Sequence, residues 1–359
     1  MATSRGGAAG PDLALLRKLC TAVAVSGDEG EVRTIVLDAL KGTAGDVEVD
    51  ALGNVLFARR GSGARRMRVM IDAHMDEVGF MIVAESSDGI YEFSTIGHLD
   101  TRGIAGKPVV VGHKHAPAVV GAKAIHLMST DDLKRPISVD ALRIDLGPGS
   151  KAALGERGSF APNFRRTGPA VMSKSLDNRL GVAILIELLR HAPANVDVLA
   201  AFTVQEEIGL RGAQVAASHF KPDVAIVIDA TPAKDLPMQY EGENNFYNSK
   251  LGLGPAVYVS NQSAIDDSRL VMFLLDTATK ARIPHQVRQP GGGGTDAGAI
   301  QRSVDGVPVV SVSVPHRYPH TAMSIARIDD WRGTYALLLT ALRRITPDVL
   351  KRGAGRHAL

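Results

Sequence analysis

Histidines and acidic residues stand where apolar stretches of this sequence end. RVMIDA leads into His74, AAFTVQ leads into Glu206 and Glu207, and AIVI leads into Asp229. A fourth stretch, VSVSVP, is followed by HRYPH, which ends at His320. The full set of candidate residues is His74, Asp76, Asp177, Glu206, Glu207, Asp229 and His320.

These residue types indicate a hydrolase that holds two divalent metal ions. Imidazoles and carboxylates together suit zinc, and they also accept cobalt or manganese. Two neighbouring cations repel each other, so a carboxylate must bridge them, and Asp177 is the candidate. A water shared by two such cations supplies hydroxide near neutral pH, and the cations stabilise a carbonyl oxygen as it becomes an oxyanion. One more carboxylate should take the proton from that water, and adjacent Glu206 and Glu207 can divide these duties.

The stretches that carry these residues predict strands alternating with helices. Strands are expected at residues 66–74, 196–205, 223–230 and 307–315, and helices at 177–192, 209–220, 268–281 and 330–345. Such alternation implies an α/β fold with a mostly parallel central sheet flanked by helices. Sites in such sheets form beyond the carboxyl ends of the strands. We therefore expect five segments, the ends of these four strands and the start of the helix at residue 177, to converge on one spot.

The texture of the sequence changes between about residues 80 and 161. Short β-branched runs there are separated by Gly and Pro, a pattern typical of a small barrel or sandwich. The sequence therefore predicts a catalytic domain of residues 1–78 plus 165–359. An inserted, β-barrel-like domain of residues 79–164 interrupts it.

Composition places the chain among ordinary cytoplasmic enzymes. The 359 residues carry a formal net charge of only +3, and the charges are dispersed, which argues against nucleic acid as a partner. The single cysteine, Cys20, excludes an internal disulfide and suits a reducing compartment. No secretory leader and no run of about 18 apolar residues is evident, so neither export nor a membrane partner is expected.

Several motifs of the sequence resemble one family. They are AHMDEVGFMI, SLDNRLG, VQEEIGLRGA, the aspartate of VIDAT, GGGTDAGAI and RYPH, and they run from residue 73 to residue 320. The sequence is similar to the glutamyl and leucyl aminopeptidases with dinuclear metal sites, the tetrahedral (TET) aminopeptidases, some of which carry an endoglucanase label. The resemblance implies an enzyme that removes N-terminal residues from short peptides.

The resemblance also implies a role for each matching residue. His74 and Asp229 would hold one metal ion, and Glu207 and His320 would hold the other. Asp177 would bridge the two ions.

Two acidic residues remain, and the family pattern assigns each a role. Glu206 would be the general base, and Asp76 would orient His74. The pattern further implies a homo-oligomer, in which the β insertion forms dimers that often join into a tetrahedral dodecamer.

Other functions fit parts of the same pattern. A dinuclear carboxypeptidase or amide deacylase would share the metal ligands, and it would differ in cleaving peptides with a blocked N-terminus. A glycosidase would also use two carboxylates, but it would need no metal. A non-catalytic binding protein with this fold would be expected to lack some ligands, and none is missing here.

The glycine run ending at Gly294 lacks the Gly-Lys-Ser/Thr ending of a phosphate-binding loop. We expect this run to border the substrate cleft, with Thr295 and Asp296 near the substrate or an interface.

Two pairs of basic residues each allow two roles. Arg165 and Arg166 are expected to be solvated, with recognition of an acidic substrate side chain as the alternative. His113 and His115 are expected to alternate on one strand face at the surface, with an extra metal site as the alternative.

Overall fold

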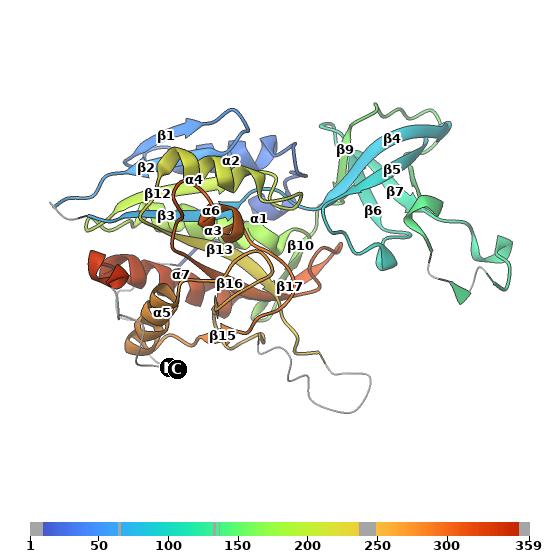
Figure 1. The fold of residues 1–359 in the computed structure, drawn as a ribbon. Coiled ribbons are helices and arrows are strands. Elements are labelled where there is room, and N and C mark those ends of the chain that lie inside the picture. The colour runs from blue at the N-terminus through green and yellow to red at the C-terminus, as the bar shows by residue number, and fades with distance from the viewer. Residues whose placement is uncertain (1–9, 64–65, 132–133, 136, 237–248, 352–359) are drawn as a thin grey trace.

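The molecule consists of a helix-covered sheet and a separate closed barrel (Figure 1). The structure is a computed structural model that describes residues 10–63, 66–131, 134–135, 137–236 and 249–351. Within these ranges the large sheet has 11 strands, and the barrel strands follow the order β4-β5-β8-β7-β6-β9. The predicted α/β class with an inserted barrel-like unit is confirmed.

Parallel strands form the centre of the sheet. In spatial order they are β12 (Asp197–Thr203), β3 (Arg68–His74), β13 (Val224–Pro232) and β16 (Val309–Arg317). Their side chains alternate between the two faces, as strand geometry requires. On β3, Val69 and Ile71 join one buried cluster, whereas Met70 joins the cluster on the opposite face. The centre is therefore buried on both sides, as its apolar sequence predicts.

Short antiparallel strands extend the sheet on both flanks. The strands are β1 (Asp46–Val49) and β2 (Val55–Arg59) beside β12, and β17 (Ser324–Arg327), β11 (Ala170–Ser173) and β10 (Phe164–Thr167) beside β16. Strand β14 (Ala256–Tyr258) also pairs antiparallel with β16, and β15 (Gln286–Arg288) pairs parallel with β14. β1 and β2, and likewise β10 and β11, are joined by short links, which suit antiparallel pairing.

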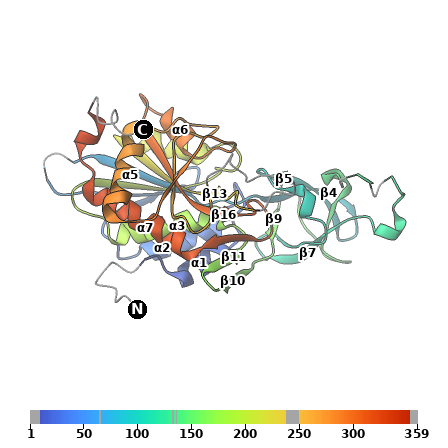
Figure 2. The same cartoon turned by 90° about the horizontal axis from the view of Figure 1, so that it is seen from below.

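Helices cover both faces of the sheet (Figure 2). One face carries α1 (Leu13–Thr21), α2 (Gly30–Leu40), α3 (Leu176–Arg190), α5 (Ser268–Ala281) and α7 (Ile328–Arg344), and the other carries α4 (Arg211–Phe220) and α6 (Ala297–Gln301). The buried Cys20 of α1 belongs to the larger cluster. The Trp331 indole packs into the same cluster and donates a hydrogen bond to the Leu180 carbonyl at 3.0 Å, so α7 is fixed against α3.

The barrel is built from strands that have their own apolar core. They are β4 (Gly79–Ser87), β5 (Ile90–Ile96), β6 (Pro108–Val111), β7 (Ala116–Gly121), β8 (Arg143–Asp145) and β9 (Arg157–Phe160). The Phe80 ring packs edge-on against Phe93 and Phe160, at 5.2 and 5.4 Å between centroids. Short 3₁₀ helices lie between the barrel strands at Thr101–Gly103, Ile125–Leu127 and Val139–Ala141, and another follows α7 at Pro347–Leu350.

The prediction for His113 and His115 is wrong in its local structure. Both lie in the turn between β6 and β7, where Gly112 has a φ of +68° and reverses the chain. They face helix α2 and the loop before it instead of lining a strand. His115 Nε2 contacts Glu31 at 2.5 Å, and His113 Nδ1 lies 3.8 Å from Asp28. These pairs link the barrel to the α2 end of the main body.

In the part of the chain that the structure describes, no helix is both long and apolar enough to cross a bilayer. The cytoplasmic location stays a prediction from the sequence.

Candidate metal centre

The carboxyl ends of the central strands bring the candidate residues together. His74 is the last residue of β3, Asp229 lies near the end of β13, and Glu207 follows the end of β12. His320 follows β16, and Asp177 lies in the first turn of α3. Segments distant in the sequence thus meet at one edge of the sheet, as the strand-end rule predicts.

The side chains form two groups that share Asp177. His74 Nε2 lies 3.3 Å from Asp177 Oδ1 and 3.5 Å from Asp229 Oδ1. On the other side, His320 Nε2 lies 3.6 Å from Asp177 Oδ2 and 3.3 Å from Glu207 Oε1. Within each of these two groups of described residues, the potential ligand atoms all lie within 4.8 Å of one another.

The spacing fits two metal ions. Atoms that sit about 2.0–2.1 Å from a tetrahedral zinc ion lie roughly 3.3 Å apart, close to the four distances observed. Asp177 Oδ1 is buried and has no hydrogen-bond partner, which is costly unless a ligand satisfies it. Each oxygen of Asp177 faces a different histidine, as a bridging carboxylate would.

Asp76 ties the two histidine- and glutamate-bearing segments together. Its Oδ1 lies 3.4 Å from His74 Nδ1 and accepts the backbone N–H of Glu206 at 3.0 Å. Its Oδ2 accepts the backbone N–H of Glu207 at 3.1 Å and the Ser26 hydroxyl at 2.6 Å. One buried carboxylate therefore lies against the imidazole and also holds the turn that carries both glutamates through their backbone N–H groups.

His320 is oriented from the barrel side of the molecule. Its Nδ1 donates to the carbonyl oxygen of His98 at 2.8 Å, which leaves Nε2 pointing toward Asp177 and Glu207. The backbone N–H of Asp100 in turn donates to the carbonyl of His320 at 3.3 Å. His98 and Asp100 follow strand β5, so the barrel contributes to the geometry of the centre.

The charges of the cluster shift its pKa values strongly. Burial lowers the pKa of His320, but the Glu207 and Asp177 carboxylates outweigh it and raise the value to about 11. Burial raises the pKa of Asp229 to about 7. Burial, reinforced by neighbouring carboxylates including Glu207, raises the pKa of Glu206 well above its usual range despite the nearby His74. Strongly shifted pKa values in neighbouring titratable groups are typical of functional sites.

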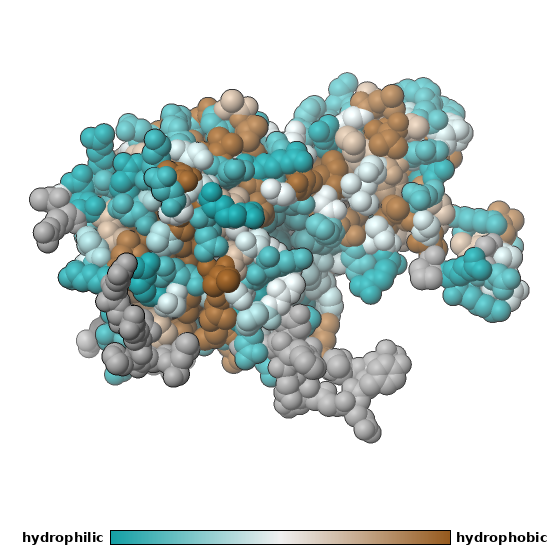
Figure 3. Space-filling view, in the orientation of Figure 1, coloured by the Kyte–Doolittle hydropathy of each residue, from teal (hydrophilic) through white to brown (hydrophobic). Residues whose placement is uncertain are grey.

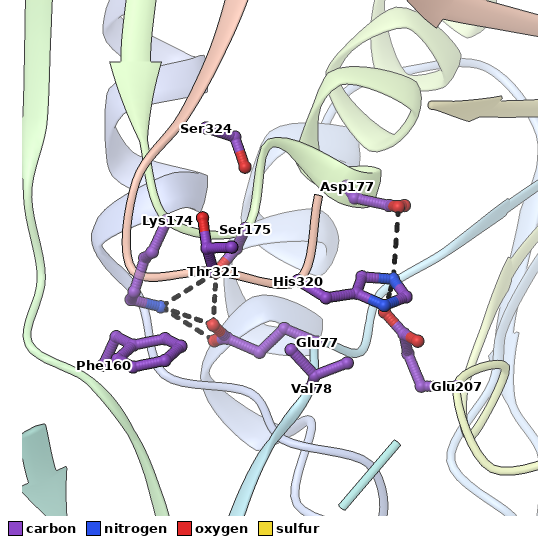
Figure 4. Close-up of a pocket in the computed structure, with 10 residues that line it drawn as sticks. All are labelled: Glu77, Val78, Phe160, Lys174, Ser175, Asp177, Glu207, His320, Thr321 and Ser324. Carbon is purple, nitrogen blue, oxygen red and sulfur yellow. Dashed lines mark hydrogen bonds and ion pairs between the residues drawn. The ribbon is translucent and has the colours of Figure 1, made fainter. Parts of the chain in front are cut away.

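A buried ionic network lies beside the centre (Figure 4). Glu77 accepts bonds at 2.8 Å to each oxygen from Lys174 Nζ, and another at 3.1 Å from Arg179. Ser175 also donates to Glu77. Since Ser175 and Arg179 flank Asp177 on either side, the network holds the segment that presents this carboxylate.

Replacing Glu77 with Gln is expected to destabilise the fold strongly. The Lys174 and Arg179 side chains are only 1% and 0% exposed, so the variant leaves two buried cations without their anion. Breaking such a pair costs about 3–5 kcal/mol. The melting temperature should fall by roughly 10 °C in thermal unfolding followed by circular dichroism. Glu48→Gln removes a carboxylate from an exposed pair with His219 and should change it little. Equal melting temperatures for the two variants would contradict this role.

The centre opens into a cleft of about 620 Å³. Glu206 lines it, as do Gly292, Gly293 and Gly294 of the glycine run, so this run borders the cleft as expected.

Thr295 and Asp296, which follow the glycine run, are buried behind the cleft. Thr295 bonds Asn261 and Ser263, and Asp296 accepts the Thr203 hydroxyl at 2.7 Å. The exposed Arg165 and Arg166 of β10 are not among the residues that line the cleft.

Sequence reasoning overlooked two residues near the centre. His316 on β16 is fully buried, its Nε2 lies 3.9 Å from Asp177 Oδ2, and burial lowers its pKa to about 4. Its position in the same HRYPH segment as His320 could have drawn attention to it. Arg288 lines the cleft from β15, a strand of three residues that carries no periodic signal.

Comparison with known proteins bears on this centre. The family described as M42 glutamyl aminopeptidase matches residues 53–337. Lysyl aminopeptidase of Pyrococcus furiosus is 32% identical over 352 residues, covering 94% of this chain and 98% of that protein. Glutamyl aminopeptidase of Lactococcus lactis subsp. cremoris is 31% identical over 324 residues, covering 86% of this chain and 89% of that protein.

The fold points the same way. A structure of the Pyrococcus horikoshii TET1 peptidase, which is described as able to assemble into a tetrahedron or a large octahedral shell, matches with a TM-score of 0.81. That match has 30% identity and covers 93% of this chain and 99% of the other. The chain therefore belongs to the M42 family of aminopeptidases.

Proposed function

We propose that the protein hydrolyses the first peptide bond of short peptides with the help of two divalent metal ions. The observation that carries the proposal is the pair of three-residue groups that share Asp177 and face a cleft. Zinc suits the imidazole and carboxylate ligands, and cobalt or manganese would also be accepted.

The geometry supports a separate role for each side chain. His74 and Asp229 would hold one ion, Glu207 and His320 the other, and Asp177 both. When bound, the ions would acidify a water and polarise the carbonyl of the scissile bond.

Among the described residues, Glu206 belongs to neither ligand group although it lines the cleft beside them. It would therefore accept the proton from the attacking water and pass it to the leaving amine. Asp76 would keep the His74 ring and the Glu206 backbone in register through its Oδ1, which faces both of them.

Peptides with free and acetylated N-termini test the reaction class. We expect cleavage of free peptides only, loss of activity after chelation, and recovery on adding zinc, cobalt or manganese. Liberated amino acids would be identified by mass spectrometry, which also separates removal of the first residue from removal of the last. Equal cleavage of acetylated peptides would favour an amide deacylase or carboxypeptidase. Full activity in chelated, metal-free protein would rule out the proposed chemistry.

We further propose that residues 1–78 plus 165–359 form the catalytic domain and residues 79–164 an inserted dimerisation domain. Apolar side chains on the barrel side are unusually exposed, among them Ile125 at 72%, Leu127 at 63% and Leu154 at 71%. Brown patches on the barrel lobe in Figure 3 show the same tendency. Exposed apolar surface of this kind fits an interface between copies of the chain, in keeping with the assemblies of the P. horikoshii peptidase.

Family membership leaves the preferred first residue open, because the two similar enzymes are named for lysyl and for glutamyl substrates.

A further inference from the structure

Two cationic side chains, Lys234 and Arg288, line the cleft apart from the metal centre, and Arg288 is the more deeply buried of the two. Arg288 ends strand β15 opposite Tyr258 of β14, and it lines the same cleft as His74 and Asp229. The residue is only 4% exposed, so its charge is almost completely removed from bulk water.

Neutral groups hold Arg288 in place. Its Nε donates to Thr231 Oγ1 at 2.9 Å, and its Nη2 donates to the Gly292 carbonyl at 2.9 Å. Nη1 makes a longer bond, 3.4 Å, to the Gln289 carbonyl. The guanidinium carbon lies 4.4 Å from the centre of the Tyr258 ring. The fork is thus fixed in one orientation by the backbone, a hydroxyl and an aromatic face.

Arg288 has no anionic partner among the residues that the structure describes. Over the described ranges, no carboxylate oxygen lies within 4.0 Å of its nitrogens, although other buried cations such as Lys174 and Arg179 share Glu77. A guanidinium has five N–H donors, and three bonds are made here, so two donors remain. A buried charge without a counter-ion is costly, and an anionic ligand would offset that cost.

The position of Arg288 limits which part of a peptide it can meet. Thr231 lies two residues beyond Asp229 on β13, so their side chains share a face, about 6.6 Å apart along the strand. The guanidinium bonded to Thr231 is therefore one side chain's reach from the metal centre. The first side chain of a peptide whose first carbonyl lies at that centre can span such a distance and meet the buried guanidinium.

We propose that Arg288 binds the side-chain carboxylate of an acidic N-terminal residue, and that glutamate or aspartate is the preferred first residue. This inference rests on the proposed function, because it assumes that peptides bind with the first residue in this cleft. The paired N–H groups of arginine match a carboxylate in geometry and charge.

Matched substrates test the proposal. Glutamyl and glutaminyl p-nitroanilides differ by one charged group and have no C-terminal carboxylate. The wild-type protein should prefer the glutamyl substrate by kcat/KM. Arg288→Met should lower kcat/KM for it by about 100-fold, as expected for loss of a charged hydrogen bond, and change the glutaminyl value less than about 3-fold. Arg288→Lys keeps the charge but not the paired N–H groups, so its kcat/KM for the glutamyl substrate should lie between those of the wild type and Arg288→Met.

Arg344→Met is the matched control. Arg344 lies 5.8 Å from the centre of the Phe273 ring and lines a different pocket, so its loss should leave the glutamyl-to-glutaminyl ratio unchanged. Metal content and melting temperature would be measured for every variant. If Arg288→Met does not fold, the wild-type ratio and Arg288→Lys decide the question.

The possible outcomes separate this inference from the proposed function. A wild-type protein that cleaves glutaminyl or leucyl substrates as well as glutamyl ones would overturn the role of Arg288 and leave the aminopeptidase proposal standing. An equal loss on both substrates in Arg288→Met would also overturn it, since the side chain would then only support the cleft. Failure to cleave any free N-terminus with metal added would instead contradict the proposed function.

Discussion

Glu206→Gln is expected to lower kcat by about 10³-fold while both metal ions stay bound. The substitution keeps the size of the side chain and removes only its ability to accept a proton. Glu206 stands outside the two ligand groups, so elemental analysis should show the same metal content as in the wild-type protein. Steady-state kinetics with saturating metal would measure the loss.

The neighbouring residue supplies the control. Glu207→Gln alters a carboxylate whose Oε1 lies 3.3 Å from His320 Nε2, so it should lose metal as well as activity. The two variants differ only in which of two adjacent glutamates is changed. Near-normal turnover of Glu206→Gln would contradict its assignment as the general base.

Asp177→Asn is expected to remove at least one of the two metal ions and to reduce activity below detection. Its two oxygens face different histidines, at 3.3 and 3.6 Å, so a neutral amide would replace the only carboxylate shared by both groups. Without that charge, two neighbouring dications repel each other with little to offset the repulsion. Equilibrium dialysis followed by elemental analysis would count the bound ions.

Asp197→Asn is a suitable control for the loss of one aspartate charge. Asp197 begins β12 at the opposite end of the strand from Glu206, and it pairs with Arg66 at 2.6 Å. This variant should retain full metal content and turnover. Wild-type stoichiometry in Asp177→Asn would show that the carboxylate does not bridge the ions.

Much of the fold follows from local sequence pattern. The long apolar runs of β3, β12, β13 and β16 predict buried parallel strands. Since sites form beyond the carboxyl ends of such strands, the polar residues that follow them are expected to lie close together. His74, Asp229 and Glu207 illustrate the point, because each lies at or just beyond such a run. Their convergence needed only topology, although which residue holds which ion was inferred from resemblance.

Other parts of the molecule depend on tertiary context. Strands β14 and β15 have three residues each, too few to show the alternation that identifies a strand. His113 and His115 have alternating spacing but lie in a turn, because Gly112 reverses the chain just before them. The position of Arg288 depends on its hydrogen bonds to Thr231, which is distant in the sequence, and to Gly292 in the following loop. Local sequence pattern does not predict such contacts.

The hydrogen bond from His320 to the His98 carbonyl links the barrel to the candidate metal centre. His98 lies two residues beyond the end of β5, so a tilt of the barrel as a rigid body would pull directly on one imidazole. A contact that fixes the position of the barrel would therefore also fix the direction of His320 Nε2. Contacts between copies of the chain at the proposed barrel interface would therefore act on turnover through the His98 carbonyl oxygen.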